Sequence, residues 1–271
     1  MRLSRLRSAV AVMLVALSCA LAPGAQAKTD YTDIWWAAGG TESGWGANFA
    51  QTGDFIFVTF FIYGPGGEPV WYTAQLRRTT GDTFSGPVYV VSGTWFGSTF
   101  FPPVPPSRVF QVGDATFTAA GAHLGTLRYR IDTVTVNKTI ERQTTDPLSV
   151  ADVYIGGLAG TVSGACPVGG SGSFRNTTQL RVLQSANVVR LEFSGADTTN
   201  VGQLNCVMQG TTTQYGKLLR ASSATYQCVT GLNTFAEIES IRQLDDGIEV
   251  HWRADVGGGC IEKGRLTAVK Q

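Results

Sequence analysis

Three tryptophans, two carboxylates and several glycines are gathered in one short segment near the start of the chain. Residues 33–48 read DIWWAAGGTESGWGAN, with Asp33 and Glu42 as the carboxylates. Indole rings supply a large contact area at low entropic cost, and glycines allow a ligand or a backbone to approach closely. The same residues also suit a packed core, so the segment predicts either a recognition surface or a core.

The chemistry such a segment could perform is hydrolysis by a pair of carboxyl groups. Glycosidases need two carboxyls that face each other across a cleft, and Glu42 is the best-placed acid. The sequence does not identify its partner, although Asp33 and Glu141 are candidates. We favour a structural role for Glu42, either capping a turn or pairing with Arg142.

The sequence gives little support for other catalytic chemistry or for a metal site. The only imidazole bases are His123 and His251, and neither stands near a second ligand type at zinc-finger spacing. The serine-containing segments at 81–87 and 169–173 depart from serine-hydrolase motifs and read as a hairpin turn and a loop. We therefore expect no metal and no cofactor, and we favour a binding protein over an enzyme.

Tryptophans are the candidate binding residues. Adjacent Trp35 and Trp36 must point to opposite faces of a strand, so only one of them can face an interior. An outward-facing indole can stack on a sugar ring or anchor a partner. The candidate ligand-binding set is Trp36, Trp45, Trp71 and Trp95.

The first 27 residues predict export. Three arginines precede an apolar run from Ala9 to Ala22, and Ala25-Gln26-Ala27 is a small-residue cleavage site. The run is too short and interrupted to serve as a membrane span, and Cys19 leaves a lipoprotein signal open. The mature chain carries 18 basic and 20 acidic residues, a formal charge of −2. We expect a secreted or periplasmic protein with no nucleic-acid partner and no membrane span.

The other cysteines, Cys166, Cys206, Cys228 and Cys260, form an even set in the second half of the chain. In an exported protein this predicts two disulfides. Three pairings are possible and the sequence does not choose among them. Pairing of Cys166 with Cys260 is preferred, because the end of a first strand meets the start of a last strand when a barrel closes.

Short runs of β-branched and aromatic residues, separated by glycine-containing turns, predict an all-β protein with two small antiparallel barrels in tandem. The expected domains are 28–146, which is rich in tryptophan, and 152–271, which holds the cysteines, with a linker at 147–151. Eight strands close a small barrel. In the first domain we expect them at 33–37, 45–51, 54–63, 69–77, 83–91, 108–119, 124–132 and 134–142.

One of these strands, 54–63, is apolar on both faces. We expect its outer face to be covered by the other half of the chain or by a long loop, in preference to an intermolecular contact. The segment Phe100–Pro106, with four prolines in seven residues, is a candidate for that cover or for a rim.

The first half resembles a group of exported bacterial β domains that carry a Glu-Ser-Gly-Trp-Gly motif. The resemblance covers residues 33–143 and rests on segments 33–36, 42–48, 57–63, 69–72, 84–87 and 140–143, with Gln51 and Gly53. It implies no particular activity. By arrangement alone, the first half is also similar to lipocalin- and avidin-like barrels. That similarity implies that Arg142 stacks on Trp35 or Trp45 to close the barrel.

The leading hypothesis is an exported, non-catalytic protein that binds an envelope or extracellular ligand, a glycan being the candidate, through its tryptophan-rich half. One alternative is a secreted hydrolase that uses Glu42. Another is an assembly or inhibitor protein that docks a partner through strand 54–63.

Overall fold

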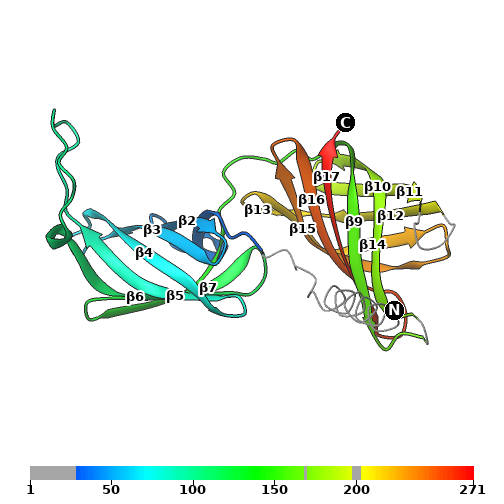
Figure 1. Cartoon of the computed structure of the whole chain (residues 1–271), viewed down its shortest axis with the longest axis horizontal. Helices are drawn as coiled ribbons and strands as arrows, with labels where there is room; N and C mark the ends of the chain where they lie inside the picture. The colour runs from blue at the N-terminus through cyan, green and yellow to red at the C-terminus, as the bar shows by residue number, and fades with distance from the viewer. Residues whose placement is uncertain (1–28, 168–169, 197–202) are drawn as a thin grey trace, which may run out of the picture. The chain divides into compact units, whose positions relative to one another are not determined.

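The chain folds into two closed antiparallel β-barrels of eight strands each, in tandem, as expected from the turn signals (Figure 1). The computed structural model describes residues 29–167, 170–196 and 203–271. The export signal and Cys19 therefore lie outside the described residues. No helix in the described part of the chain has the length and apolar character needed to cross a membrane.

The first barrel is an up-and-down meander in which each strand pairs with the next and the last pairs with the first. All eight expected strands are present, with ends that differ from the sequence-based bounds by at most three residues. The strands are β1 (Asp33–Ala37), β2 (Gly46–Thr52), β3 (Phe55–Tyr63), β4 (Pro69–Thr80), β5 (Thr83–Val91), β6 (Val109–Ala119), β7 (Leu124–Ile131) and β8 (Val134–Arg142).

The second barrel closes differently, because its strands follow the ring order β12-β11-β10-β9-β17-β16-β15-β14 and β14 returns to β12. The short strand β13 continues the pairing along β14. The strands are β9 (Asp152–Gly164), β10 (Gly172–Ser185), β11 (Val188–Ala196), β12 (Gln203–Thr211), β13 (Thr213–Tyr215), β14 (Leu218–Cys228), β15 (Asn233–Leu244), β16 (Gly247–Asp255) and β17 (Cys260–Lys270).

Each barrel has its own core, built from the alternate residues that point inward along every strand. The core of the first barrel is mainly aromatic, with Trp35, Phe49, Phe60 and Phe117 fully buried. Trp35, Phe49 and Phe117 meet one another with ring centroids 5.0 to 5.4 Å apart. The core of the second barrel is mainly aliphatic.

Two disulfides lie at the seams of the second barrel. Cys166 is bonded to Cys260, where β9 meets β17, which confirms the pairing preferred from barrel closure. Cys206 is bonded to Cys228, directly across the β12–β14 pair that completes the ring. Crosslinks thus stabilise the second barrel, whereas the first is held by aromatic packing.

The seam between β1 and β8 closes the first barrel around Arg142. Its guanidinium lies 5.1 Å from the ring centroid of Trp35, and the two residues are direct neighbours across the strand pair. This confirms the closing contact implied by the resemblance to lipocalin- and avidin-like barrels. Arg142 Nη1 also donates to Asp33 Oδ2 at 2.9 Å, with both side chains buried.

Candidate functional site

The adjacent tryptophans at the start of the first barrel divide between its two faces, as strand geometry requires. Trp35 is fully buried in the core, and its Nε1 donates to the carbonyl of Tyr31 at 3.0 Å. Trp36 is half-buried on the outer face. Its Nε1 is buried and has no acceptor among the described residues, so this indole retains an unused hydrogen-bond donor.

Trp36 belongs to a row of residues that crosses four neighbouring strands on the outside of the barrel. Trp35 pairs with Ala47, which places Trp36 beside Gly46. Gly46 pairs with Phe61, and Phe61 pairs with Trp71. The row therefore reads tryptophan, glycine, phenylalanine, tryptophan. We define the aromatic face as Trp36, Phe57, Phe61, Tyr63 and Trp71.

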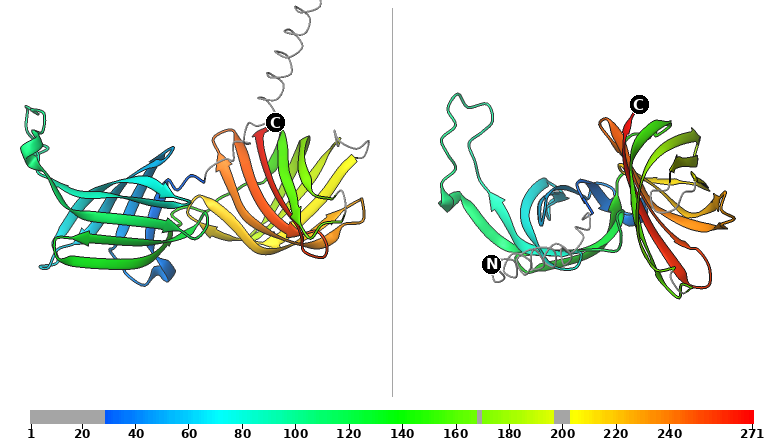
Figure 2. Two further views of the ribbon diagram at one scale, coloured as in Figure 1. Left: turned by 60° about the horizontal axis from the view of Figure 1, so that its bottom comes forward. Right: turned by 45° about the vertical axis from the view of Figure 1, so that its right-hand side comes forward.

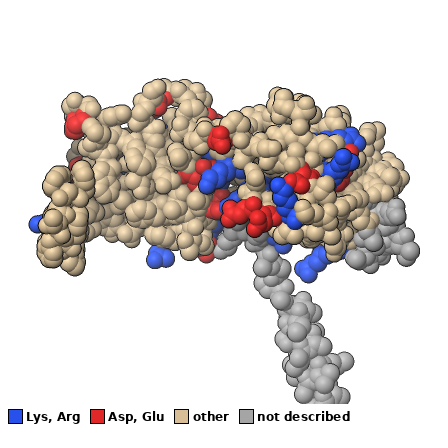
Figure 3. Space-filling model, turned by 90° about the horizontal axis from the view of Figure 1, so that it is seen from above, with Lys and Arg blue, Asp and Glu red and all other residues tan. Residues whose placement is uncertain are grey.

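The aromatic face is open to solvent along β3 and β4. Phe57, Phe61 and Tyr63 alternate with the buried residues of β3 and are 38%, 52% and 58% exposed, and Trp71 is 56% exposed. The expectation that another part of the chain covers β3 is therefore wrong. The visible side of the first barrel, at the left of Figure 3, is almost without charged side chains.

Polar residues occupy the outward-facing rows next to the aromatic row. One register row further along the strands, Asn48 pairs with Thr59, and Thr59 pairs with Thr73, all on the outer side. Beyond them, Phe57 pairs with Gln75. The face thus alternates ring surfaces with hydroxyl and amide groups.

Glycines of the Glu-Ser-Gly-Trp-Gly segment shape this face. A Cβ at Gly44 would lie 2.5 Å from the ring of Tyr63, so only glycine lets that ring rest against the chain there, and its φ of +87° also favours glycine. A Cβ at Gly46 would meet only the carbonyl oxygen of Trp35, at 3.7 Å. Gly46 therefore leaves a shallow gap between Trp36 and Phe61.

Trp45, the third indole of the segment, turns away from the aromatic face. It is half-buried and packs on the core of the barrel, and its Nε1 donates to the hydroxyl of Tyr129 at 3.0 Å. Lys138 Nζ lies 5.4 Å from its ring centroid. The sequence could not separate Trp45 from Trp36, because the loop between β1 and β2 breaks the alternation.

Glu42 lies on the surface and forms an ion pair with Lys138. The expected pair with Arg142 is wrong, because Arg142 is directed to Asp33 and to the carbonyls of Thr32 and Ala122. The loop that contains Glu42 stands outside the seam, whereas Asp33 is on β1 directly at it. Glu141, the other suggested acid, accepts the backbone N–H of Gly39 at 2.8 Å.

Trp95, the last candidate tryptophan, lies in the loop that joins β5 to β6. This loop, which we call the apolar loop, comprises residues 92–107 and extends beyond the ends of the strands in each view (Figures 1 and 2). It does not cover β3. Its aromatic residues are Trp95, Phe96, Phe100 and Phe101, all exposed.

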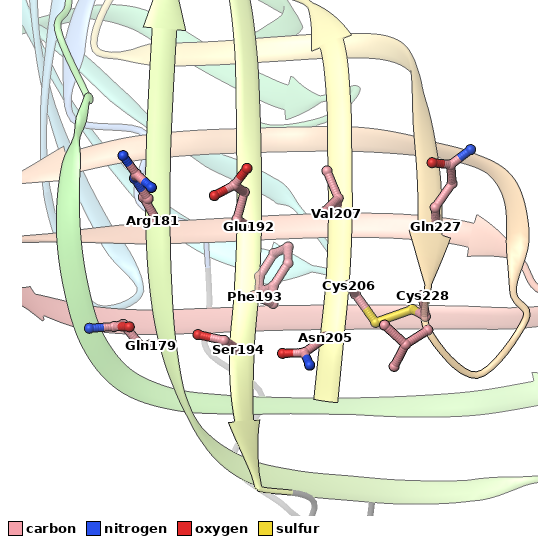
Figure 4. A pocket seen from close by; sticks show the side chains of 11 residues that line it. Gln179, Arg181, Glu192, Phe193, Ser194, Asn205, Cys206, Val207, Gln227 and Cys228 are labelled. Atoms are coloured by element: carbon pink, nitrogen blue, oxygen red, sulfur yellow. A yellow bond between two sulfur atoms is a disulfide. The ribbon is translucent and has the colours of Figure 1, made fainter. Parts of the chain in front are cut away.

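The second barrel offers a groove of a different character on its outer surface, with a volume of about 500 Å³. Two polar rows line it, and Figure 4 shows them side by side. In the register of the strands, Arg181 pairs with Glu192, and Glu192 with Val207. The neighbouring row contains Gln179, Ser194 and Asn205. The groove is open and combines these polar side chains with apolar surface from Phe193, Val207 and Val229, and Glu192 is the one carboxylate in its lining.

Sequence reasoning missed one carboxyl group, Glu262, inside the second barrel. Its Oε1 accepts from Trp252 Nε1 at 2.8 Å and from the Tyr226 hydroxyl at 3.1 Å. Burial raises the pKa of Glu262 above its ordinary value, against the opposing effect of these two donors, and burial also raises the pKa of Tyr226. Alternation along β17 would have revealed it, since Glu262 shares parity with buried Leu266 and Ala268.

Within the described ranges, no group of three or more His, Cys, Asp or Glu residues could hold a metal ion. No protein-family profile matches the chain, and no curated protein is significantly similar to it.

Proposed function

We propose that the chain is an exported, non-catalytic binding protein that holds a glycan of the cell envelope or of the surroundings on the aromatic face of its first barrel. The observation that carries this proposal is the row formed by Trp36, Gly46, Phe61 and Trp71 across β1 to β4. Export is supported by the leader-like sequence of residues 1–27 and by the two disulfides.

A sugar ring has apolar faces and a polar edge, and the aromatic face offers partners for both. The exposed indole of Trp71 and the ring of Phe61 supply surfaces on which a pyranose can stack. The gap at Gly46 lets a ring approach the sheet backbone closely. Asn48, Thr59 and Gln75 supply donors and acceptors for the hydroxyl groups at its edge.

Trp36 borders the row with its ring, which lies against Gly40, and its Nε1 is buried and therefore out of reach of a ligand on the surface. Trp45 is left out of the proposed binding set, because its Nε1 is already bonded to Tyr129 and its ring packs on the core.

Binding to a glycan array and to insoluble polysaccharides tests the proposal, with Trp71→Ala and Gly46→Val as the variants. Trp71→Ala removes an exposed stacking surface, and Gly46→Val fills the gap. Each should weaken binding by roughly tenfold or more, because about 1.4 kcal/mol corresponds to a factor of ten. Phe235→Ala is the matched control, since Phe235 is 66% exposed on the second barrel. Absence of binding, or equal binding by all variants, would contradict the proposal.

Docking of a protein partner on the same surface is the second candidate function. It is favoured by the exposed phenylalanines of β3, since soluble monomers rarely leave a contiguous aromatic strand face uncovered. Size-exclusion chromatography with light scattering is the measurement. Self-association that Phe61→Ser abolishes would support docking between copies, whereas a monomer that binds glycans would favour the first proposal.

A further inference from the structure

The geometry of the apolar loop points to a second binding surface, and we propose that this loop inserts into the interfacial layer of a lipid bilayer. This goes beyond glycan binding, because it concerns residues 92–107 and not the aromatic face. The insertion is peripheral: the loop enters the headgroup and upper acyl region and does not span the membrane.

The composition of the loop favours insertion into lipid. It has no charged residue between Ser92 and Ser107. Its aromatic side chains are among the most exposed in the described chain: Trp95 is 69%, Phe96 86% and Phe100 72% exposed. Exposed phenylalanine is costly in water and favourable in an acyl environment, and tryptophan prefers the region where the two meet.

The backbone of the loop also favours insertion, because few of its N–H groups would be left unpaired in lipid. In an apolar medium each unpaired N–H or C=O group costs several kcal/mol. Four of the five residues from Pro102 to Pro106 are prolines, which have no N–H to leave unpaired.

At the tip of the loop, hydrogen bonds within the loop satisfy further polar groups. Ser98 N–H donates to the Trp95 carbonyl at 3.0 Å, and the Ser98 hydroxyl donates to the Phe100 carbonyl at 3.0 Å. At the base, Ser92 N–H donates to the Arg108 carbonyl at 3.1 Å. The cost of transferring this loop into lipid is therefore lower than for an ordinary loop of equal length.

The shape of the loop suits insertion into a lipid bilayer better than binding to the surface of a protein partner. The loop projects beyond the strand ends (Figure 2). The exposed aromatic residues come both before and after the turn in the sequence, with Trp95 and Phe96 before Gly97 and Phe100 and Phe101 after it. A bilayer surrounds a projecting segment, whereas a partner's surface covers one side. The prolines keep the loop extended, which lowers the entropic cost of insertion.

Co-sedimentation with phosphatidylcholine vesicles tests this proposal, using the chain from residue 28 onward so that the apolar leader does not bind by itself. The protein should partition onto the vesicles, and roughly 0.5 M salt should leave partitioning nearly unchanged, because the loop is uncharged. Phe96→Ser combined with Phe100→Ser should weaken the partition coefficient by roughly tenfold or more.

Phe235→Ser is the matched control, because it removes a phenylalanine that is 66% exposed on the second barrel. It should bind vesicles like the unaltered protein. The proposal is overturned if the unaltered protein stays in solution at millimolar lipid, if the loop variant binds equally well, or if salt abolishes binding. Glycan binding by the loop variant should be unchanged. A negative vesicle result would therefore overturn membrane insertion without affecting the proposal that the aromatic face binds a glycan.

Discussion

Arg142 and Asp33 form a buried ion pair across the strand seam that closes the first barrel, with Nη1 of the arginine 2.9 Å from Oδ2 of the aspartate. The side chains are only 2% and 5% exposed. A buried pair of this kind is expensive to desolvate, and it is retained only where its hydrogen bonds are satisfied. Here Arg142 Nε also donates to the carbonyl of Ala122 at 2.7 Å, which ties the seam to the loop before β7.

Replacing Arg142 with methionine should destabilise the first barrel by about 3 to 5 kcal/mol, because it leaves the Asp33 carboxylate buried without its cation. Urea unfolding followed by circular dichroism measures the change. The double variant Asp33→Leu with Arg142→Met should regain much of the loss, since it removes both charges. Equal loss in the single and double variants would show that packing, and not the unpaired charge, is responsible.

The two disulfides should contribute unequally to the second barrel. Cys166–Cys260 spans 94 residues and Cys206–Cys228 spans 22. In the chain-entropy model a longer closed loop is restrained more in the unfolded state, so loss of the first bond should cost about 1 kcal/mol more than loss of the second. Paired Cys→Ser variants compared by urea unfolding give the two values. A larger loss for Cys206–Cys228 would indicate that the β12–β14 seam depends on its crosslink.

Turn chemistry and strand alternation were sufficient to predict the barrels. Glycine and aspartate at the hairpins gave the eight strands of the first barrel, and barrel closure gave the Cys166–Cys260 bond. These features are local, or depend on a ring closing on itself, so they can be inferred from one sequence.

The contacts that the sequence did not predict depend on the conformation of loops and on which distant segments of the chain pack together. Glu42 lies in the loop before β2, where no periodicity indicates direction, and it pairs with Lys138 instead of Arg142. The exposure of Phe61 could not be predicted either, because an apolar strand looks the same whether a neighbour covers it or not. The structure resolves both by showing what each side chain contacts.

Among the glycines with positive φ in the first barrel, Gly44 should tolerate replacement less well than Gly53. At Gly53 an added Cβ meets nothing within 4 Å, so Gly53→Ala should cost only the backbone strain, about 1 kcal/mol. Gly44→Ala adds a collision with the ring of Tyr63, so it should cost about 1 kcal/mol more. Thermal unfolding of both variants measures the difference. If the collision is the cause, Tyr63→Ala added to Gly44→Ala removes that extra loss, and an unchanged loss would refute it.

Glu262 should make the stability of the second barrel depend on pH in an unusual direction. Its pKa is raised in the folded state by burial, so the folded chain holds this proton more tightly than the unfolded chain. The stabilising contribution of the protonated form is complete below the ordinary carboxyl pKa. It is lost as the pH rises through the higher folded pKa. Over that window the second barrel should become less stable as the solution becomes less acidic.

Glu262→Gln tests this, because the amide oxygen can still accept from Trp252 and Tyr226 while the side chain cannot ionise. The variant should lose this pH dependence and should be more stable than the unaltered protein at neutral pH. Hydrogen exchange of β16 and β17, measured by mass spectrometry from about pH 5 to pH 8 and corrected for intrinsic rates, reports on this barrel. Glu239→Gln, at an exposed position of β15, is the control and should retain the dependence. Parallel pH profiles for the unaltered protein and Glu262→Gln would show that the buried carboxyl does not set the stability of the second barrel.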